Sequence, residues 1–265
     1  MSELYDLLRD AIIDERPVVL VTVIEGPNTG AKLAVELDGS NSGTLGNLEL
    51  DRVVGRDAVG ELEAGRSGVR HYGVGGQTNE SDLSVFIESF ASPPIMLVFG
   101  AVDFTAALAR AGKLLGFNVV MADPRAMFAT VKRFPMVDKV FVAWPDEVFD
   151  IYADRLGPND AVCILTHDPK FDVLAVQRAL ATDVGYIGVM GSRRTHAVRL
   201  KRLSEAGVTP VEINRLMAPI GLDIGSRTPE EVAVSVCAEI IANRTGHAAP
   251  SLRDGDGTIH RVVEG

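Results

Sequence analysis

The most basic of the short polar runs in this sequence is Gly191-Ser192-Arg193-Arg194. It joins a permissive glycine and a hydroxyl group to two guanidinium groups at the expected start of a helix. Helix-end N–H groups and arginine side chains both favour negative charge. We therefore predict an anion site here, with phosphate as the first candidate. The alternative is that the arginines pair with surface carboxylates, which are abundant in a chain with 36 acidic residues.

A second polar run is Thr166-His167-Asp168, with Asp172 close behind it. Hydroxyl, imidazole and carboxylate groups can together hold a proton, a metal ion or the edge of a ligand. An Asp-Pro step also starts a helix well, so capping is the alternative role of Asp168. No further histidine or aspartate is spaced to complete a metal site, so we predict no metal ligands and assign no catalytic residue.

A glycine turn and an acidic residue follow two other expected strands. In Gly100-Ala101-Val102-Asp103 only the first glycine of a dinucleotide-binding turn is present, and Val102 and Asp103 both hinder a pyrophosphate. Asp123 follows roughly 20 residues later, where a carboxylate can bind a ribose hydroxyl or fix its own loop ahead of Pro124. Standard NAD binding is thus disfavoured, and capping of the next helix is the alternative role of Asp103.

A last candidate segment is the apolar loop of residues 218–225, which precedes the final helix. Gly221 and Gly225 indicate close backbone approach or positive φ, and Asp223 adds a carboxylate. The loop either lines a ligand site or is a buried structural connection.

Most of these runs stand at the ends of predicted parallel strands. Short apolar segments alternate with helical stretches from residue 94 onward, which is the pattern of a parallel sheet covered on both faces. We predict an α/β fold with a doubly wound, mainly parallel Rossmann-like sheet, in which ligands bind beyond the carboxyl ends of the strands. The five expected strands lie within residues 94–100, 118–124, 139–145, 161–168 and 185–192. The last helix carries Thr228 as N-cap, Pro229, Glu231 in a capping box and Gly246 past its end.

The first 90 residues predict a small mixed α/β domain. Its expected helices cover residues 3–15 and 48–65, and its expected strands lie at 18–26, 31–39, 69–72 and 83–90, with a segment rich in glycine and serine over 40–46. Two successive prolines, Pro93 and Pro94, favour an extended connector. We therefore expect domains over residues 1–90 and 91–246 and a loose tail over 247–265.

Composition narrows the function classes. Of the 265 residues, 46% are hydrophobic and 23% charged, as in ordinary globular proteins, and the net charge of −10 repels nucleic acid. Residues 1–17 lack a signal-peptide pattern, and no segment approaches the roughly 20 apolar residues of a membrane span. We expect a cytoplasmic protein. Cys163 and Cys237 both lie in apolar runs, which indicates buried thiols rather than a disulfide or a zinc site.

The order and spacing of these motifs resemble the Rossmann-type domain of the XdhC/CoxI family over most of residues 94–245. The runs that carry the resemblance are Pro124-Arg125 with Arg133-Phe134-Pro135, Thr166-His167-Asp168 with Asp172, Tyr186-Ile187-Gly188 ahead of Gly191-Ser192-Arg193-Arg194, Pro219-Ile220-Gly221-Leu222-Asp223, and Thr228-Pro229-Glu230-Glu231.

The resemblance implies an accessory factor rather than an enzyme. Such a protein binds the molybdenum cofactor, assists its sulfuration and inserts it into a molybdenum hydroxylase of the xanthine or CO dehydrogenase type. Arg193 and Arg194 would hold the pterin phosphate. The implied partners are the client hydroxylase and a sulfur donor, a nucleotide is a further candidate ligand, and a homo-oligomer is expected. The predicted cofactor-binding residues are Gly100, Asp123, Arg125, Thr166, His167, Asp168, Gly191, Ser192, Arg193, Arg194, Gly221 and Asp223.

Two departures identify a divergent member. The glycine-rich turn Gly43 to Glu49 has no cysteine, and Gly100-Ala101-Val102-Asp103 stands where the family keeps Gly-Ala-Gly-His. Two other functions therefore stay open. One is an NAD(P)-dependent oxidoreductase that uses Asp123 for the ribose and His167 as acid and base. The other is a degenerate interaction scaffold without bound cofactor.

Overall fold

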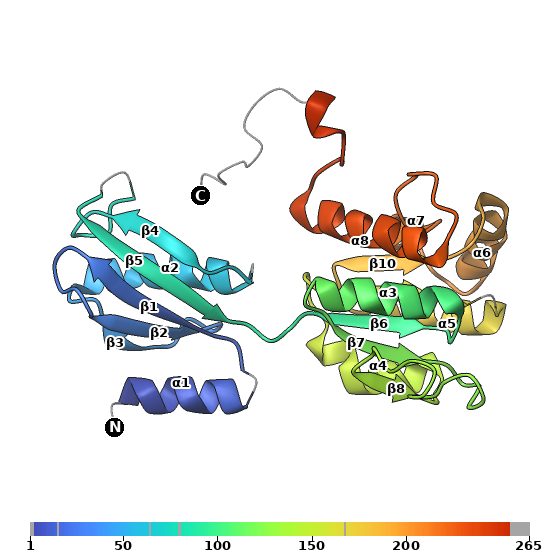
Figure 1. The fold of residues 1–265 in the computed structure, drawn as a ribbon, viewed down its shortest axis with the longest axis horizontal. Helices are drawn as coiled ribbons and strands as arrows, with labels where there is room; N and C mark the ends of the chain where they lie inside the picture. The colour runs from blue at the N-terminus through green and yellow to red at the C-terminus, as the bar shows by residue number, and fades with distance from the viewer. Residues whose placement is uncertain (1–2, 15, 64, 79–80, 167, 255–265) are drawn as a thin grey trace. The chain divides into compact units, whose positions relative to one another are not determined.

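A computed structural model describes residues 3–14, 16–63, 65–78, 81–166 and 168–254. The chain divides into two compact units, residues 1–92 and 93–265 (Figure 1). Each unit has its own hydrophobic core, so the two are described separately. None of the helices in the described part of the chain is both long and apolar enough to span a membrane.

The first unit is a five-stranded antiparallel sheet in the order β3-β2-β1-β5-β4. Alternation along the central strand β1 points Val19, Val21 and Val23 toward the helix α2, where they share one core with Val54 and Leu62. The elements are α1 (Glu3–Ile13), β1 (Val18–Glu25), β2 (Lys32–Glu36), β3 (Asn41–Thr44), α2 (Leu48–Glu63), β4 (Gly68–Tyr72) and β5 (Leu83–Phe90).

One strand of this unit differs from the sequence-based expectation. The glycine- and serine-rich residues 40–46 are not among the expected strands, but Asn41–Thr44 pair with β2 as strand β3, and Gly43 lies opposite Leu33. The segment Asn-Ser-Gly-Thr has low β-propensity, and only one of its residues has a β-branched side chain. Pairing with the buried strand β2 therefore forms β3 against its local preference.

The second unit is a six-stranded, fully parallel sheet in the order β11-β10-β9-β6-β7-β8, which confirms the predicted Rossmann-like fold. The chain runs outward from β6 in one direction and from β9 in the other, so the switch point lies between these two strands. The strands are β6 (Ile95–Phe99), β7 (Asn118–Ala122), β8 (Lys139–Phe141), β9 (Ala161–Ile164), β10 (Tyr186–Val189) and β11 (Leu216–Met217).

Helices cover both faces of this sheet (Figure 1). One face packs against α3 and α8, and the other against α4, α5 and α6. The connection between β7 and β8, residues 123–138, consists of turns instead of a helix and buries Ala129 and Phe134. The helices are α3 (Asp103–Leu114), α4 (Pro145–Tyr152), α5 (Pro169–Leu180), α6 (Arg193–Glu205), α7 (Pro210–Ile213) and α8 (Pro229–Thr245), with 3-10 turns at Ala153–Arg155 and Leu252–Asp254.

The last helix begins and ends as its sequence predicts. The Thr228 hydroxyl accepts a hydrogen bond from the N–H of Glu231 at 3.2 Å, and the Glu231 carboxylate accepts one from the N–H of Thr228 at 3.0 Å. Gly246 follows the helix with a left-handed φ of 66°. Of the predicted tail, residues 247–254 are exposed and residues 255–265 lie outside the described residues.

Candidate functional site

The switch point of the sheet brings together two segments whose residue types suggest ligand binding. Strands β6 and β9 are neighbours, and the N–H of Leu165 donates to the Phe99 carbonyl at 2.8 Å. Gly100 has a φ of +119°, and a Cβ at this position would lie 3.0 Å from Cγ2 of Thr166. Glycine is therefore required for the backbone to turn here while it touches the end of β9.

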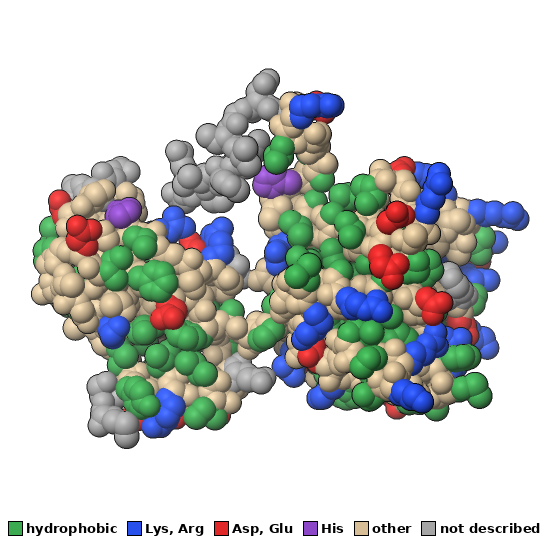
Figure 2. Space-filling model, in the orientation of Figure 1, with side chains coloured by type: hydrophobic (Ala, Val, Ile, Leu, Met, Phe, Trp, Pro, Cys, Tyr) green, Lys and Arg blue, Asp and Glu red, His purple; other side chains and the backbone are tan. Residues whose placement is uncertain are grey.

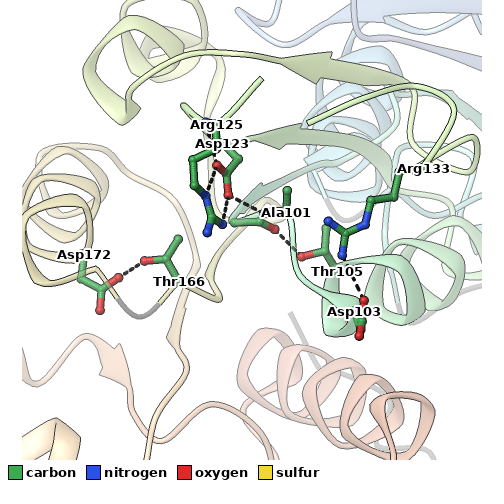
Figure 3. A network of polar contacts seen from close by, with 9 residues as sticks. Ala101, Asp103, Thr105, Asp123, Arg125, Arg133, Thr166 and Asp172 are labelled. Atoms are coloured by element: carbon green, nitrogen blue, oxygen red, sulfur yellow. Dashed lines mark hydrogen bonds and ion pairs between the residues drawn. The ribbon is translucent and has the colours of Figure 1, made fainter. Parts of the chain in front are cut away.

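Asp123, at the end of β7, is 1% exposed and lies beside this turn. Its Oδ2 accepts a hydrogen bond from the Ala101 N–H at 2.7 Å, and its Oδ1 accepts one from the Arg125 N–H at 2.9 Å. The Arg125 guanidinium also pairs with the carboxylate, with Nη2 to Oδ2 at 2.7 Å (Figure 3). Both oxygens of Asp123 are thus engaged in fixing its own loop and the glycine turn.

The environment of Asp123 predicts a pH dependence of stability. Burial acts to raise its pKa, but the hydrogen bonds from Arg125 and Ala101 outweigh burial and the pKa lies below the ordinary value of 3.8. Because the folded-state pKa is depressed, the stabilisation is complete above about pH 3.8 and is lost as the pH falls through the folded-state value. We expect Asp123→Asn to be less stable than wild type at pH 7 and the difference to shrink below pH 3.8. Urea unfolding at a series of pH values measures this, and a pH-independent difference would contradict it.

The residue at the N-cap of α3 is not the one that the sequence offered. Asp103 does not take the alternative role of a helix cap, because Val102 occupies the N-cap position, with φ −114° and ψ 170°, and makes no side-chain cap. An N-cap residue needs extended backbone angles, which Val102 adopts, whereas Asp103 is already inside the first turn. The Asp103 carboxylate is exposed and pairs with Arg133 at 3.1 Å (Figure 3).

A buried ion pair links the ends of β9 and β10. The Thr166 hydroxyl donates to Oδ1 of Asp172, and Arg199 Nη2 donates to Oδ2 of Asp172 at 3.0 Å and to the Met190 carbonyl at 2.7 Å. The side chains of Asp172 and Arg199 are only 6% and 4% exposed. Strand ends and the helices α5 and α6 are therefore tied together by one charged pair.

Two residues with structural roles at the site were not predicted from the sequence: Arg199, and Glu239, whose carboxylate accepts hydrogen bonds from the Gly221 N–H and the Tyr186 hydroxyl. Arg199 and Leu203, four residues apart, are the buried residues of α6, so the helical period gave a usable signal. The sequence around Glu239 on α8 shows no comparable pattern.

The capping alternative for Asp168 is observed, because its side chain accepts a hydrogen bond from the Lys170 N–H at 2.9 Å. His167 lies outside the described residues.

The N-terminal end of α6 borders a cavity of about 510 Å³. The Ser192 hydroxyl caps this helix by accepting a hydrogen bond from the Thr195 N–H at 3.1 Å, and Gly191 precedes it. Arg193 pairs with Asp223 at 3.9 Å, and both side chains are almost fully exposed, at 89% and 88%. Five predicted site residues and one further residue meet here: the cavity lining consists of Ser192, Arg193, Arg194, Pro219, Gly221 and Asp223.

The loop that carries Gly221, in the lining of this cavity, is held by half-buried polar contacts. Oε2 of Glu239 accepts hydrogen bonds from the Gly221 N–H at 2.8 Å and from the Tyr186 hydroxyl at 2.6 Å. Gly221 has a φ of +94°, and a Cβ there would lie 2.5 Å from Oγ of Ser235. Burial, with the nearby Cys163 and Glu239, raises the pKa of Tyr186, so its hydroxyl stays protonated and keeps donating.

Both cysteines are free and buried, as predicted. Burial raises the pKa of Cys163 well above its usual value and that of Cys237 to about 11. Neither thiol ionises near neutral pH, and thiolate is the reactive form of cysteine. Among the described residues, no group of three histidine, cysteine or acidic side chains is arranged to hold a metal ion.

Comparisons with known proteins identify the family of the chain. The chain is 33% identical over 165 residues to a Bacillus subtilis (strain 168) protein named as a probable subunit of xanthine dehydrogenase, which is 62% of this chain and 47% of that protein. It is 30% identical over 105 residues to the Escherichia coli (strain K12) molybdenum cofactor insertion chaperone PaoD, 38% of this chain and 33% of that one. The chain thus spans less than half the length of these relatives.

A crystal structure described as a xanthine dehydrogenase from Bacillus halodurans has the same fold, with a TM-score of 0.56 and 21% identity over 95% of this chain and 98% of that one. The XdhC Rossmann domain family matches residues 96–240, and the XdhC and CoxI family matches residues 11–73. Because the first of these matches alone covers more than half of the chain, the protein belongs to the XdhC/CoxI family.

Proposed function

We propose that this chain is an accessory protein that binds the molybdenum cofactor and supports its insertion into a molybdenum hydroxylase. The observation that carries the proposal is the 510 Å³ cavity at the start of α6, where Arg193, Arg194 and Ser192 meet in an XdhC Rossmann domain. The names of two relatives, a molybdenum cofactor insertion chaperone and a probable xanthine dehydrogenase component, point in the same direction.

The cavity offers the chemistry that a phosphate group on a pterin requires. The first turn of a helix leaves N–H groups without partners inside the helix, and the positive end of its dipole favours an anion. Arg193 and Arg194 add guanidinium forks that match phosphate oxygens. Asp223 competes for Arg193, but an ion pair at 3.9 Å with both side chains exposed contributes little. A bound phosphate would therefore displace it readily.

We further propose that sulfuration of the cofactor depends on a separate sulfur donor. The two cysteines of the chain are buried thiols with raised pKa values, so neither is suited to carry sulfur as a nucleophile. The chain's own contribution is then to hold the phosphate end of the cofactor and to leave its metal end open to the donor and the client.

Anaerobic purification tests this function. We expect the protein, produced in cells that synthesise the cofactor, to carry molybdenum by metal analysis and pterin by fluorescence after release. Preparation from cells that cannot synthesise the cofactor is the control. Protein that carries neither would overturn the proposal. Binding of NAD(P)H instead of the molybdenum cofactor would support the oxidoreductase. That activity needs a free carboxylate for the ribose, whereas the Asp123 carboxylate is engaged by Arg125 and Ala101.

A further inference from the structure

A second hollow lies on the same helix as the proposed cofactor cavity. It is a groove of about 760 Å³ between α5 and α6, which we name the α5–α6 groove. Its lining consists of Asp168, Pro169, Lys170, Val173, Leu174, Gln177 and Arg202. Val173 and Leu174 form an apolar, half-buried floor. The Gln177 side chain donates to the Ala206 carbonyl at 3.1 Å and so ties the two helices together beneath the groove.

Two of the three charged side chains that line the groove, Lys170 and Arg202, are positive, and the third, Asp168, caps α5. Lys170 and Arg202 are exposed, and neither has an ion-pair partner within the part of the chain that the structure describes. The helix α6 carries five basic residues and one acidic residue, whereas residues 93–265 as a whole are nearly neutral, with 19 basic and 20 acidic residues. Figure 2 shows Lys and Arg side chains gathered over the end of the second unit where α6 lies. An acidic partner is therefore attracted to the basic side of α6 more strongly than to the rest of this nearly neutral unit.

From these features we infer that the α5–α6 groove docks an acidic amphipathic segment of the client molybdenum hydroxylase. Its apolar side chains would lie on Val173 and Leu174, and its carboxylates would pair with Lys170 and Arg202. This inference rests on the proposed function. The groove suits a client because Arg194, at the cavity, and Arg202, at the groove, lie on one helix, roughly 12 Å apart along its axis. A docked client is thereby held beside the cofactor that it receives.

The test uses the full chain and an apo-xanthine dehydrogenase freed of its cofactor, with binding measured by biolayer interferometry at low and high salt. The Lys170→Glu/Arg202→Glu variant is expected to bind at least about tenfold more weakly, because two favourable charge pairs become repulsive. Its molybdenum and pterin content should equal that of wild type, since neither residue lines the cofactor cavity. Binding by wild type should weaken with salt as the charges are screened.

The matched control is Arg110→Glu/Arg244→Glu, which makes the same change of charge at exposed positions on the opposite layer, α3 and α8. Equal weakening by both double variants, or by neither, would overturn the docking assignment. Failure of cofactor-loaded wild type to bind the apo-enzyme overturns the docking and leaves the proposed function standing. If wild type binds the apo-enzyme through the groove but carries no cofactor, the proposed function is overturned and the docking assignment stands. Self-association that Lys170→Glu/Arg202→Glu abolishes would assign the groove to a second copy instead.

Discussion

Replacing both cavity arginines, as Arg193→Ala/Arg194→Ala, is expected to weaken retention of the molybdenum cofactor by roughly a hundredfold or more. A hydrogen bond to a charged group contributes about 1.5–3 kcal/mol, and each arginine supplies at least one to a phosphate in this arrangement. Because both side chains are exposed, we expect the free energy of unfolding to change by less than about 0.5 kcal/mol. Anaerobic purification followed by molybdenum analysis and pterin fluorescence measures the loss.

Two further variants separate a phosphate site from a general effect of charge. Arg193→Lys/Arg194→Lys keeps the charges but loses the planar forks, so we expect retention between that of wild type and the alanine variant. Arg110→Ala/Arg244→Ala removes two exposed basic residues from α3 and α8 and should retain the cofactor fully. If the cavity variant retained as much cofactor as this control, the phosphate would have to bind elsewhere.

Most helices and strands of the second unit could be predicted because the sequence patterns that specify them are local. Apolar strands such as Ile95–Phe99 are buried along their full length, and the capping box at Thr228 and Glu231 specifies a helix start within four residues. Strand β11 has only two residues, Leu216 and Met217, and so is too short to show a pattern. It exists because parallel pairing with β10 satisfies its backbone.

The candidate site could be predicted only in part, because several of its contacts join residues that are far apart in the sequence. Glycine, hydroxyl and arginine next to one another at 191–194 identify a helix end that suits an anion, and Ser192, Arg193 and Arg194 line one cavity. The contact between Asp172 and Arg199 joins residues 27 positions apart, and no local pattern pairs them. Likewise, the engagement of Asp123 by the Ala101 N–H depends on two strands being neighbours. Such contacts follow from the tertiary fold rather than from sequence spacing.

The buried pair of Asp172 and Arg199 is expected to produce the largest stability effect in the second unit. Asp172→Ala leaves the Arg199 charge buried at 4% exposure without its carboxylate, and removal of one partner of such a pair costs about 3–5 kcal/mol. The single tryptophan, Trp144, lies 5.7 Å from the ring of Phe171, the neighbour of Asp172. Urea unfolding followed by tryptophan fluorescence therefore reports on this region of the second unit.

A double variant distinguishes a buried charge from lost packing. In Asp172→Ala/Arg199→Met no charge remains buried at this position, and Nη1 of Arg199, which has no hydrogen-bond partner among the described residues, is removed as well. We expect this double variant to be more stable than Asp172→Ala alone. The exposed pair serves as the control, and Asp103→Ala, which breaks the contact with Arg133, should cost less than about 1 kcal/mol. If Asp172→Ala cost no more than Asp103→Ala, the buried pair would not be what joins β9 and β10 to their helices.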